Sequence, residues 1–216
     1  LQGQGLQDTL SSVQVVESSW ETLSPALQSA YKRLAVFPGR FSREAALAVI
    51  GAHQETLLDQ LLRKSLLSPT AISGQTQDSR ELYSFHPLLR SFAQRQLALD
   101  ADAQHEARQR FAAYFAGFIP ELAADVVATE NLNRVGADEE NFLAFLEMAI
   151  TDRDFEYANI LIEPVLWHFY RAGRFALGLA TFKASIARLD PDDPTHRTTL
   201  GALHCACSWL EHWADS

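Results

Sequence analysis

The sequence predicts a mainly α-helical protein in two parts, a helical domain that carries one β-hairpin and, after it, an array of helices. Three observations predict this fold class. Apolar residues recur every three to four positions through most of the chain, which is typical of helices that bury one face. Two short segments flank the polar stretch "SGQTQDSR" and indicate a hairpin. Beyond residue 100 only helical patterns occur, joined by short connectors as in stacked antiparallel pairs.

The composition indicates a soluble globular protein that does not bind nucleic acid by itself. Its 216 residues are 47% hydrophobic, which is enough for a core of ordinary size. The formal net charge is −9 and the isoelectric point is near 5.2, whereas phosphate contact needs a dominant basic surface. No apolar run reaches the roughly 18 residues of a membrane span, and the N-terminus does not resemble a signal peptide. We therefore expect a cytoplasmic protein without membrane contact.

The two cysteines are expected to be free thiols. Cys205 and Cys207 lie two residues apart on a predicted helix, so their side chains point about 200° apart and cannot easily bridge. Packed thiols of this kind are typical of a reducing compartment.

The first predicted helices follow a Gly- and Gln-rich start that lacks periodicity and an initiator Met. We interpret residues 1–19 as a linker from a missing upstream domain, with helical periodicity starting near Ser11. Ser24 is a candidate N-cap with Pro25 at the first helical position, in "LSPALQSAYKRLAVF". Ser42 is expected to cap a short helix that ends at Gly51.

A leucine-rich amphipathic helix from Glu55 to Lys64 precedes the hairpin segments "SLLSPTAI" and "ELYSF", and Pro87 then opens a helix through about Leu99. Helix, helix, helix, hairpin, helix is the order of a winged-helix domain, whose wing is the hairpin. We assign that domain to residues 20–99. The helical array, residues 100–216, is expected to contain helices at 103–118, 120–127, 138–152, 155–172, 174–189 and 195–214.

Three stretches, "SSWETLSPALQSAYKRLAVFPGRFSREAALAVIG", "LLDQLLRKSLLS" and "YSFHPLLRSFAQRQL", resemble the winged-helix part of STAND-class signal-transduction ATPases, which have an NB-ARC or similar core. A fourth, "RVGADEENFLAFLEMAI", is similar to the helix that opens the helical sensor region of that class. The resemblance implies an intact bacterial regulator with an upstream nucleotide-binding domain that holds ATP or ADP, and an array that binds an inducer or a protein partner. No GxxxxGK[ST] loop occurs here, so we expect no enzymatic activity and no cofactor in this chain.

The stretch "IEPVLWHFYRAGRFALGLATFKASIARLDP" resembles a tetratricopeptide repeat, in which small residues let paired helices approach and large ones fill the space between repeats. Leu166 and Pro191 depart from the pattern, which indicates a degenerate repeat. Thr195 to Trp213 resembles the first helix of a following repeat whose partner helix is cut off at Ser216. The matching positions are Ile162, Phe169, Gly173, Phe175, Gly178, Phe182 and Ser185.

His86 is the main candidate for a functional side chain. In the resembled family, a histidine at the start of the last winged-helix helix, in a Met-His-Asp-like motif, contacts the nucleotide's β-phosphate; here Phe85 and Pro87 depart from that motif. The resemblance thus implies that His86 is a phosphate sensor, and Arg90, four residues later, a second contact. Alternatively, His86 caps the helix or bonds within its domain, and Arg90 is solvated or intradomain.

The remaining candidates are aromatic and basic. Aromatic residues of the array line either a partner or ligand groove or the core, and the groove candidates are Trp167, Tyr170, Trp209 and Trp213. The basic pairs Lys32–Arg33 and Arg63–Lys64 are too short, and the Glu55 helix too rich in leucine and acid, for DNA docking.

The histidines His168, His204 and His212 lack the spacing of a helical metal site. A free-standing interaction scaffold with a structural winged helix remains the alternative function.

Overall fold

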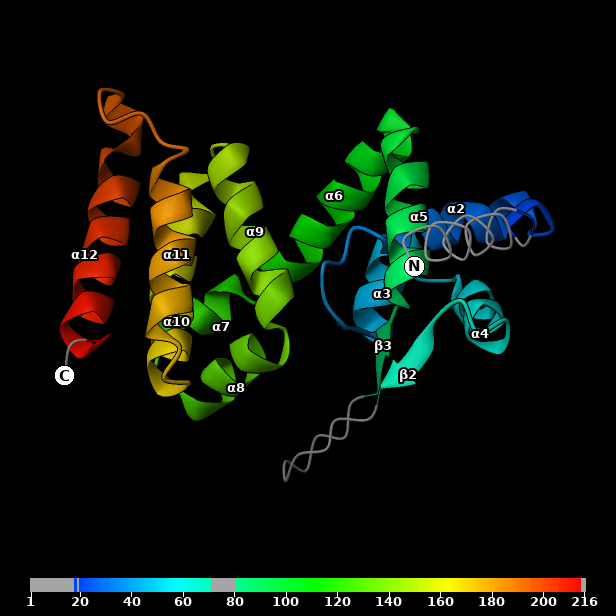
Figure 1. Cartoon of the computed structure of the whole chain (residues 1–216), viewed down its shortest axis with the longest axis horizontal. Coiled ribbons are helices and arrows are strands. Elements are labelled where there is room, and N and C mark those ends of the chain that lie inside the picture. The colour runs from blue at the N-terminus through cyan, green and yellow to red at the C-terminus, as the bar shows by residue number, and fades with distance from the viewer. Residues whose placement is uncertain (1–17, 19, 71–80, 215–216) are drawn as a thin grey trace, which may run out of the picture. The chain divides into compact units, whose positions relative to one another are not determined.

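The computed structural model describes Ser18, residues 20–70 and residues 81–214, and it shows a mainly helical protein (Figure 1), as predicted. The chain separates into two compact units, the first ending at Phe111 and the second beginning at Ala112. The sequence predicts this division between residues 99 and 100. Of the predicted linker at residues 1–19, the structure describes only Ser18.

A small antiparallel sheet lies among the helices of the first unit. Its outer strands β1 (Phe41–Ser42) and β2 (Ser68–Thr70) both pair with the central strand β3 (Leu82–Ser84). Phe41 lies opposite Tyr83, and Ser68 lies opposite Ser84. The β2 and β3 pairing confirms the predicted strands, while their connector "SGQTQDSR" lies outside the described residues. Strand β1 was not predicted. The elements are α2 (Pro25–Leu34), β1 (Phe41–Ser42), α3 (Arg43–Ile50), α4 (Glu55–Arg63), β2 (Ser68–Thr70), β3 (Leu82–Ser84), α5 (Pro87–Ala98) and α6 (Ala101–Ala116).

The predicted helix boundaries in this unit have the expected chemistry. The Ser24 hydroxyl accepts a hydrogen bond from the Leu27 amide at 3.4 Å, and the Ser42 hydroxyl accepts one from the Ala45 amide at 3.2 Å. Gly51 ends α3 with a φ of 123°, a conformation that side chains rarely adopt. These local signals fix where α2 and α3 start and where α3 stops.

The part of α6 up to Phe111 belongs to the first unit. Phe111 is fully buried with its ring centroid 5.4 Å from that of Phe37, which in turn stacks on Phe41 at 4.6 Å. Polar contacts add to this attachment, because Arg110 donates to the Val49 carbonyl at 3.1 Å and pairs with Glu106. Packing therefore carries α6 into the first unit beyond the sequence break "LDADAQ" that had suggested the boundary.

The second unit consists of helices. Their bounds are α7 (Ile119–Ala124), α8 (Thr129–Ala137), α9 (Glu139–Thr151), α10 (Phe155–Arg171), α11 (Phe175–Ile186), the 3-10 turn η1 (Pro194–His196) and α12 (Arg197–Ala214). Helix α8 was not predicted, because we read Gly136 as a break. Gly136 instead lies inside α8, where a Cβ would approach the His168 ring to 3.2 Å. This glycine allows close helix packing and does not end the helix.

Helices α10, α11 and α12 stand side by side at the C-terminal end of the second unit (Figure 1). Phe155 contacts His196 near the start of α10 and α12, with ring centroids 5.0 Å apart, and Tyr170 contacts Trp213 near their ends at 5.4 Å. The two helices therefore run parallel, with contacts along most of their length.

Helix α11 packs against α10 and α12 through the positions that carried the repeat resemblance. Phe182 and Ser185 are buried, and a Cβ on Gly178 would lie 3.0 Å from the Phe169 ring and 2.6 Å from Leu210. Gly173 has a φ of 63° in the turn between α10 and α11. These large and small residues let α11 pack closely against α10 and α12.

Within the described residues, no helix is both long and apolar enough to cross a bilayer. Both cysteines are free thiols, as predicted, but only Cys207 is packed, and burial raises the pKa of its thiol. Cys205 is exposed, so the prediction of a packed thiol is wrong for this residue.

Candidate functional site

The four aromatic groove candidates come together on the surface of the second unit. Trp167 and Tyr170 of α10 contact each other with ring centroids 5.6 Å apart, and Trp209 and Trp213 of α12 do so at 6.5 Å. Across the two helices, Trp167 lies 5.8 Å from Trp209 and Tyr170 lies 5.4 Å from Trp213. We call these four residues the aromatic face.

The aromatic face is partly open to solvent, whereas its aromatic neighbours are core residues. Trp209 is 43% exposed and Trp213 is 38% exposed, while Phe169 and Phe182 are completely buried. Ring pairs in these positions are mostly edge-on, with interplanar angles of 88° for Trp167 and Tyr170 and 64° for Trp167 and Trp209. Edge-on packing stabilises the rings against one another.

A carboxylate lies at the edge of the aromatic face. The indole Nε1 of Trp167 donates a hydrogen bond to Glu163 Oε1 at 3.3 Å, one helical turn earlier on α10. Glu163 is itself exposed, and so is Glu156 two turns before it on the same side of α10. The arrangement combines flat apolar surfaces with negative charge.

His86 is exposed at the start of α5 and is the N-cap residue by backbone conformation, with a φ of −65° and a ψ of 140°. Its carbonyl accepts the first hydrogen bond of the helix, from the Arg90 amide at 2.9 Å, and its side chain makes no capping hydrogen bond. His86 therefore caps the helix, as the alternative expected, but through its backbone and not through its imidazole. In the described part of the chain, the ring is free to meet a ligand from outside.

Arg90 has an intradomain role. Its Nη2 donates to the Gly39 carbonyl at 3.0 Å, and its Nε is buried without a partner in the described residues. The guanidinium thus anchors the loop before β1, and the contact corresponds to the intradomain alternative.

The basic pair at the end of α2 is neutralised inside the first unit. Lys32 pairs with Asp100 and Arg33 with Glu106, both at 2.5 Å, and the Lys32 hydrogen bond lowers the pKa of Asp100. On α4, Leu58 and Leu61 are fully buried, so the leucine side of this helix packs in the core.

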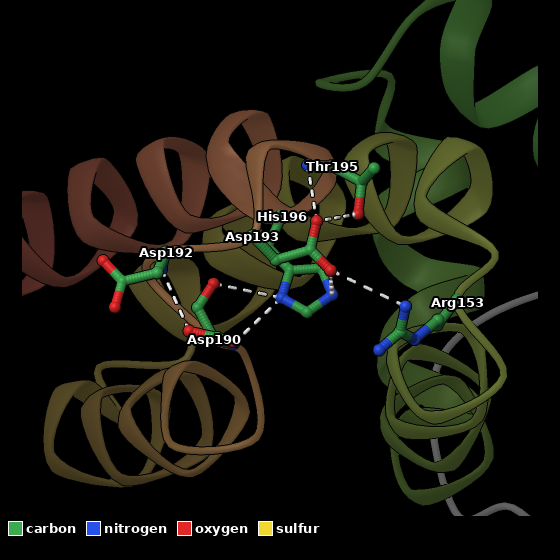
Figure 2. Close-up of polar contacts among 6 residues, drawn as sticks. All are labelled: Arg153, Asp190, Asp192, Asp193, Thr195 and His196. Carbon is green, nitrogen blue, oxygen red and sulfur yellow. Dashed lines mark hydrogen bonds and ion pairs between the residues drawn. The ribbon is translucent and has the colours of Figure 1, made fainter.

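A buried histidine that the sequence did not single out organises the turn before α12 (Figure 2). His196 is 4% exposed, and its Nδ1 accepts a hydrogen bond from the Asp190 amide at 2.9 Å. Its Nε2 lies 3.5 Å from Asp193 Oδ2, which also lies 3.6 Å from Arg153. The Asp193 carboxylate accepts from the Thr195 amide at 2.9 Å and from its hydroxyl at 2.7 Å, which lowers the pKa of Asp193.

The contacts of this cluster stabilise the turn before α12, and they do not form a catalytic arrangement. A nucleophilic hydroxyl would have to donate to the imidazole, but the Thr195 hydroxyl donates to Asp193. Asp193 is the N-cap residue of η1. What the sequence could not indicate was the burial of His196 against Phe155, because that contact joins distant segments.

A second polar cluster joins α9, α10 and α11. Glu139 accepts a hydrogen bond from His168 Nε2 at 2.7 Å and pairs with Arg174. His168 therefore has a structural partner. Among the described residues, no group of histidines, cysteines and carboxylates has the geometry of a metal site.

Comparisons of the chain with protein-family models, with curated proteins and with solved structures find no match. The residues and their geometry are therefore the basis on which a function is proposed.

Proposed function

We propose that this chain is a regulatory part of a STAND-class ATPase, in which the first unit is a winged-helix domain and the second is a tetratricopeptide-like sensor array. The array binds an inducer or a protein partner, and the winged helix couples that event to a nucleotide-binding domain that lies upstream in the intact protein. The readout is transcriptional regulation in the cytoplasm.

The exposed aromatic face is the observation that carries the binding role. Large aromatic side chains are enriched where proteins bind partners, and single exposed rings need no explanation, but a contiguous group of them does. Trp209 and Trp213 retain 43% and 38% of their accessible surface although they touch two further rings. A ligand that covers these rings removes apolar surface from water and gains the corresponding free energy.

Two features support the nucleotide link. The helix, strand, two helices, two strands and helix of the first unit follow the order of a winged-helix domain. His86 stands exposed at the N-terminal end of α5, so its imidazole and the helix dipole both favour an anion at this position. The phosphate it contacts belongs to ADP held by the upstream domain, in the closed state.

The alternative is an interaction scaffold in which the first unit is a spacer. Both proposals use the aromatic face, but only the switch needs a ligand with different affinities for two states of the intact protein. The reading frame distinguishes them, since the switch requires a P-loop ATPase domain upstream of Leu1.

The test of the switch is ADP retention by the intact protein. His86→Ala is expected to speed ADP release and to raise basal activity, because one phosphate contact of the closed state is lost. His53→Ala is the matched control, since His53 is exposed in the same unit between α3 and α4. Equal ADP release from the wild type and from His86→Ala contradicts the sensor role.

A further inference from the structure

The negative charge of the protein is concentrated in the second unit. Residues 112–216 contain sixteen acidic and seven basic residues, a formal charge of −9, whereas residues 1–111 contain eleven of each. The array thus carries the whole net charge of the chain. An acidic field of this kind attracts cations and repels phosphate-bearing partners.

Most basic side chains of the second unit are already paired. Five of the seven form ion pairs with acids of the same unit: Arg134, Arg153, Arg174, Lys183 and Arg188. The other two, Arg171 and Arg197, form no ion pair with the described residues. Ion pairs within the second unit therefore neutralise most of its basic side chains, and exposed carboxylates remain in excess.

Part of that surplus borders the aromatic face. Glu156, Glu163 and Trp167 follow one another on α10 at spacings of seven and four residues, which places them on one side of the helix. Both glutamates are exposed, and the second is held at the Trp167 indole by the 3.3 Å hydrogen bond. A cation that stacks on the indole at this point also meets a carboxylate.

We propose that the aromatic face binds a peptide segment of a partner protein that carries arginine, with its guanidinium stacked on the exposed rings and paired with Glu163. The proposal rests on the proposed binding role of the array and names its partner class.

Arginine suits this surface better than other cations. Its guanidinium is planar, so it can stack on a Trp or Tyr face and still direct its edge donors at a carboxylate. Lysine supplies the charge without the plane, and it is more strongly hydrated.

The closing experiment is a fluorescence titration of the 216-residue chain with an (Arg-Gly)4 peptide and with the same peptide made with lysine or with citrulline. Citrulline keeps the shape of arginine and removes its charge. The arginine peptide is expected to bind about tenfold more tightly than the citrulline peptide, and its affinity is expected to fall as salt is added.

Four variants locate the site. Trp209→Ala and Glu163→Gln are each expected to weaken arginine-peptide binding by about three- to tenfold. Two matched controls, Leu177→Ala on α11 and Glu140→Gln on α9, change an exposed apolar residue and an exposed acid outside the aromatic face. Both are expected to bind the arginine peptide as the wild type does.

Each outcome supports or overturns the assignment. Equal binding of the arginine and citrulline peptides, or full binding by Trp209→Ala, overturns it. If a proline-rich or acidic peptide binds at Trp209 in place of the arginine peptide, the partner class is wrong but the binding role of the array stands. If no peptide class responds to Trp209→Ala, both fail, whereas the ADP test of His86 is independent of either result.

Discussion

Gly178→Ala is expected to destabilise the second unit, because no space exists for one more methyl group at this position of α11. An added Cβ would lie 2.6 Å from Leu210 Cδ1 and 3.0 Å from two atoms of the Phe169 ring. Both neighbours are completely buried, so neither can turn outward. Overfilling a packed site costs about 1–3 kcal/mol, and replacing glycine by alanine in a helix regains about 0.5–1 kcal/mol. We expect a net loss of about 1–2 kcal/mol in the free energy of unfolding.

The assay is urea unfolding followed by tryptophan fluorescence in a Trp20→Phe background. Trp20 belongs to the first unit, and the tryptophans that remain, Trp167, Trp209 and Trp213, all report on the second.

Gly201→Ala is the matched control. Gly201 is also helical, but a Cβ there would meet nothing within 4 Å, so this variant is expected to gain about 0.5–1 kcal/mol. If Gly178→Ala is as stable as Gly201→Ala, the steric explanation of the α10, α11 and α12 packing is refuted.

Two further predictions concern the first unit. Phe111→Ala is expected to cost about 3–5 kcal/mol in the unfolding transition that Trp20 fluorescence reports, because Phe111 is fully buried against Phe37; a transition unchanged in Trp20 fluorescence would place α6 outside the first unit. The Lys32 hydrogen bond lowers the pKa of Asp100 below its ordinary value of 3.8, so its contribution to stability is present above that pH and is lost as pH falls through the lower folded-state pKa. Lys32→Met is therefore expected to lose less stability than the wild type below about pH 4 in urea unfolding, and identical pH profiles would contradict the pairing.

Local signals predicted the parts of the fold that are determined within a few residues. Ser24 and Ser42 cap their helices through their own side chains, and Gly173 takes the positive φ of a turn. Such features depend on neighbouring backbone groups, so a single sequence contains them.

The features that sequence reasoning missed depend on distant residues. Strand β1 has two residues and exists because it pairs with β3, about 40 residues later in the chain. Gly136 looked like a break, but its role depends on the approach of His168 from α10. The division inside α6 follows from the burial of Phe111 among residues of earlier elements. None of these contacts leaves a periodic trace in the sequence.

The candidate site divides in the same way. The aromatic types and helical spacing of Trp167, Tyr170, Trp209 and Trp213 identified them as a set, and the structure brings all four together. Their exposure, in contrast to the burial of Phe169, could not be predicted, because both kinds of residue lie on the same helices at helical spacing.

The most direct test of the central claim is ADP release from the intact protein after the arginine peptide is added. Binding at the aromatic face is expected to favour the open state, so the peptide should speed ADP release from the wild type and leave release from Trp209→Ala unchanged. A peptide that binds the wild type at the aromatic face without altering ADP release would contradict the account.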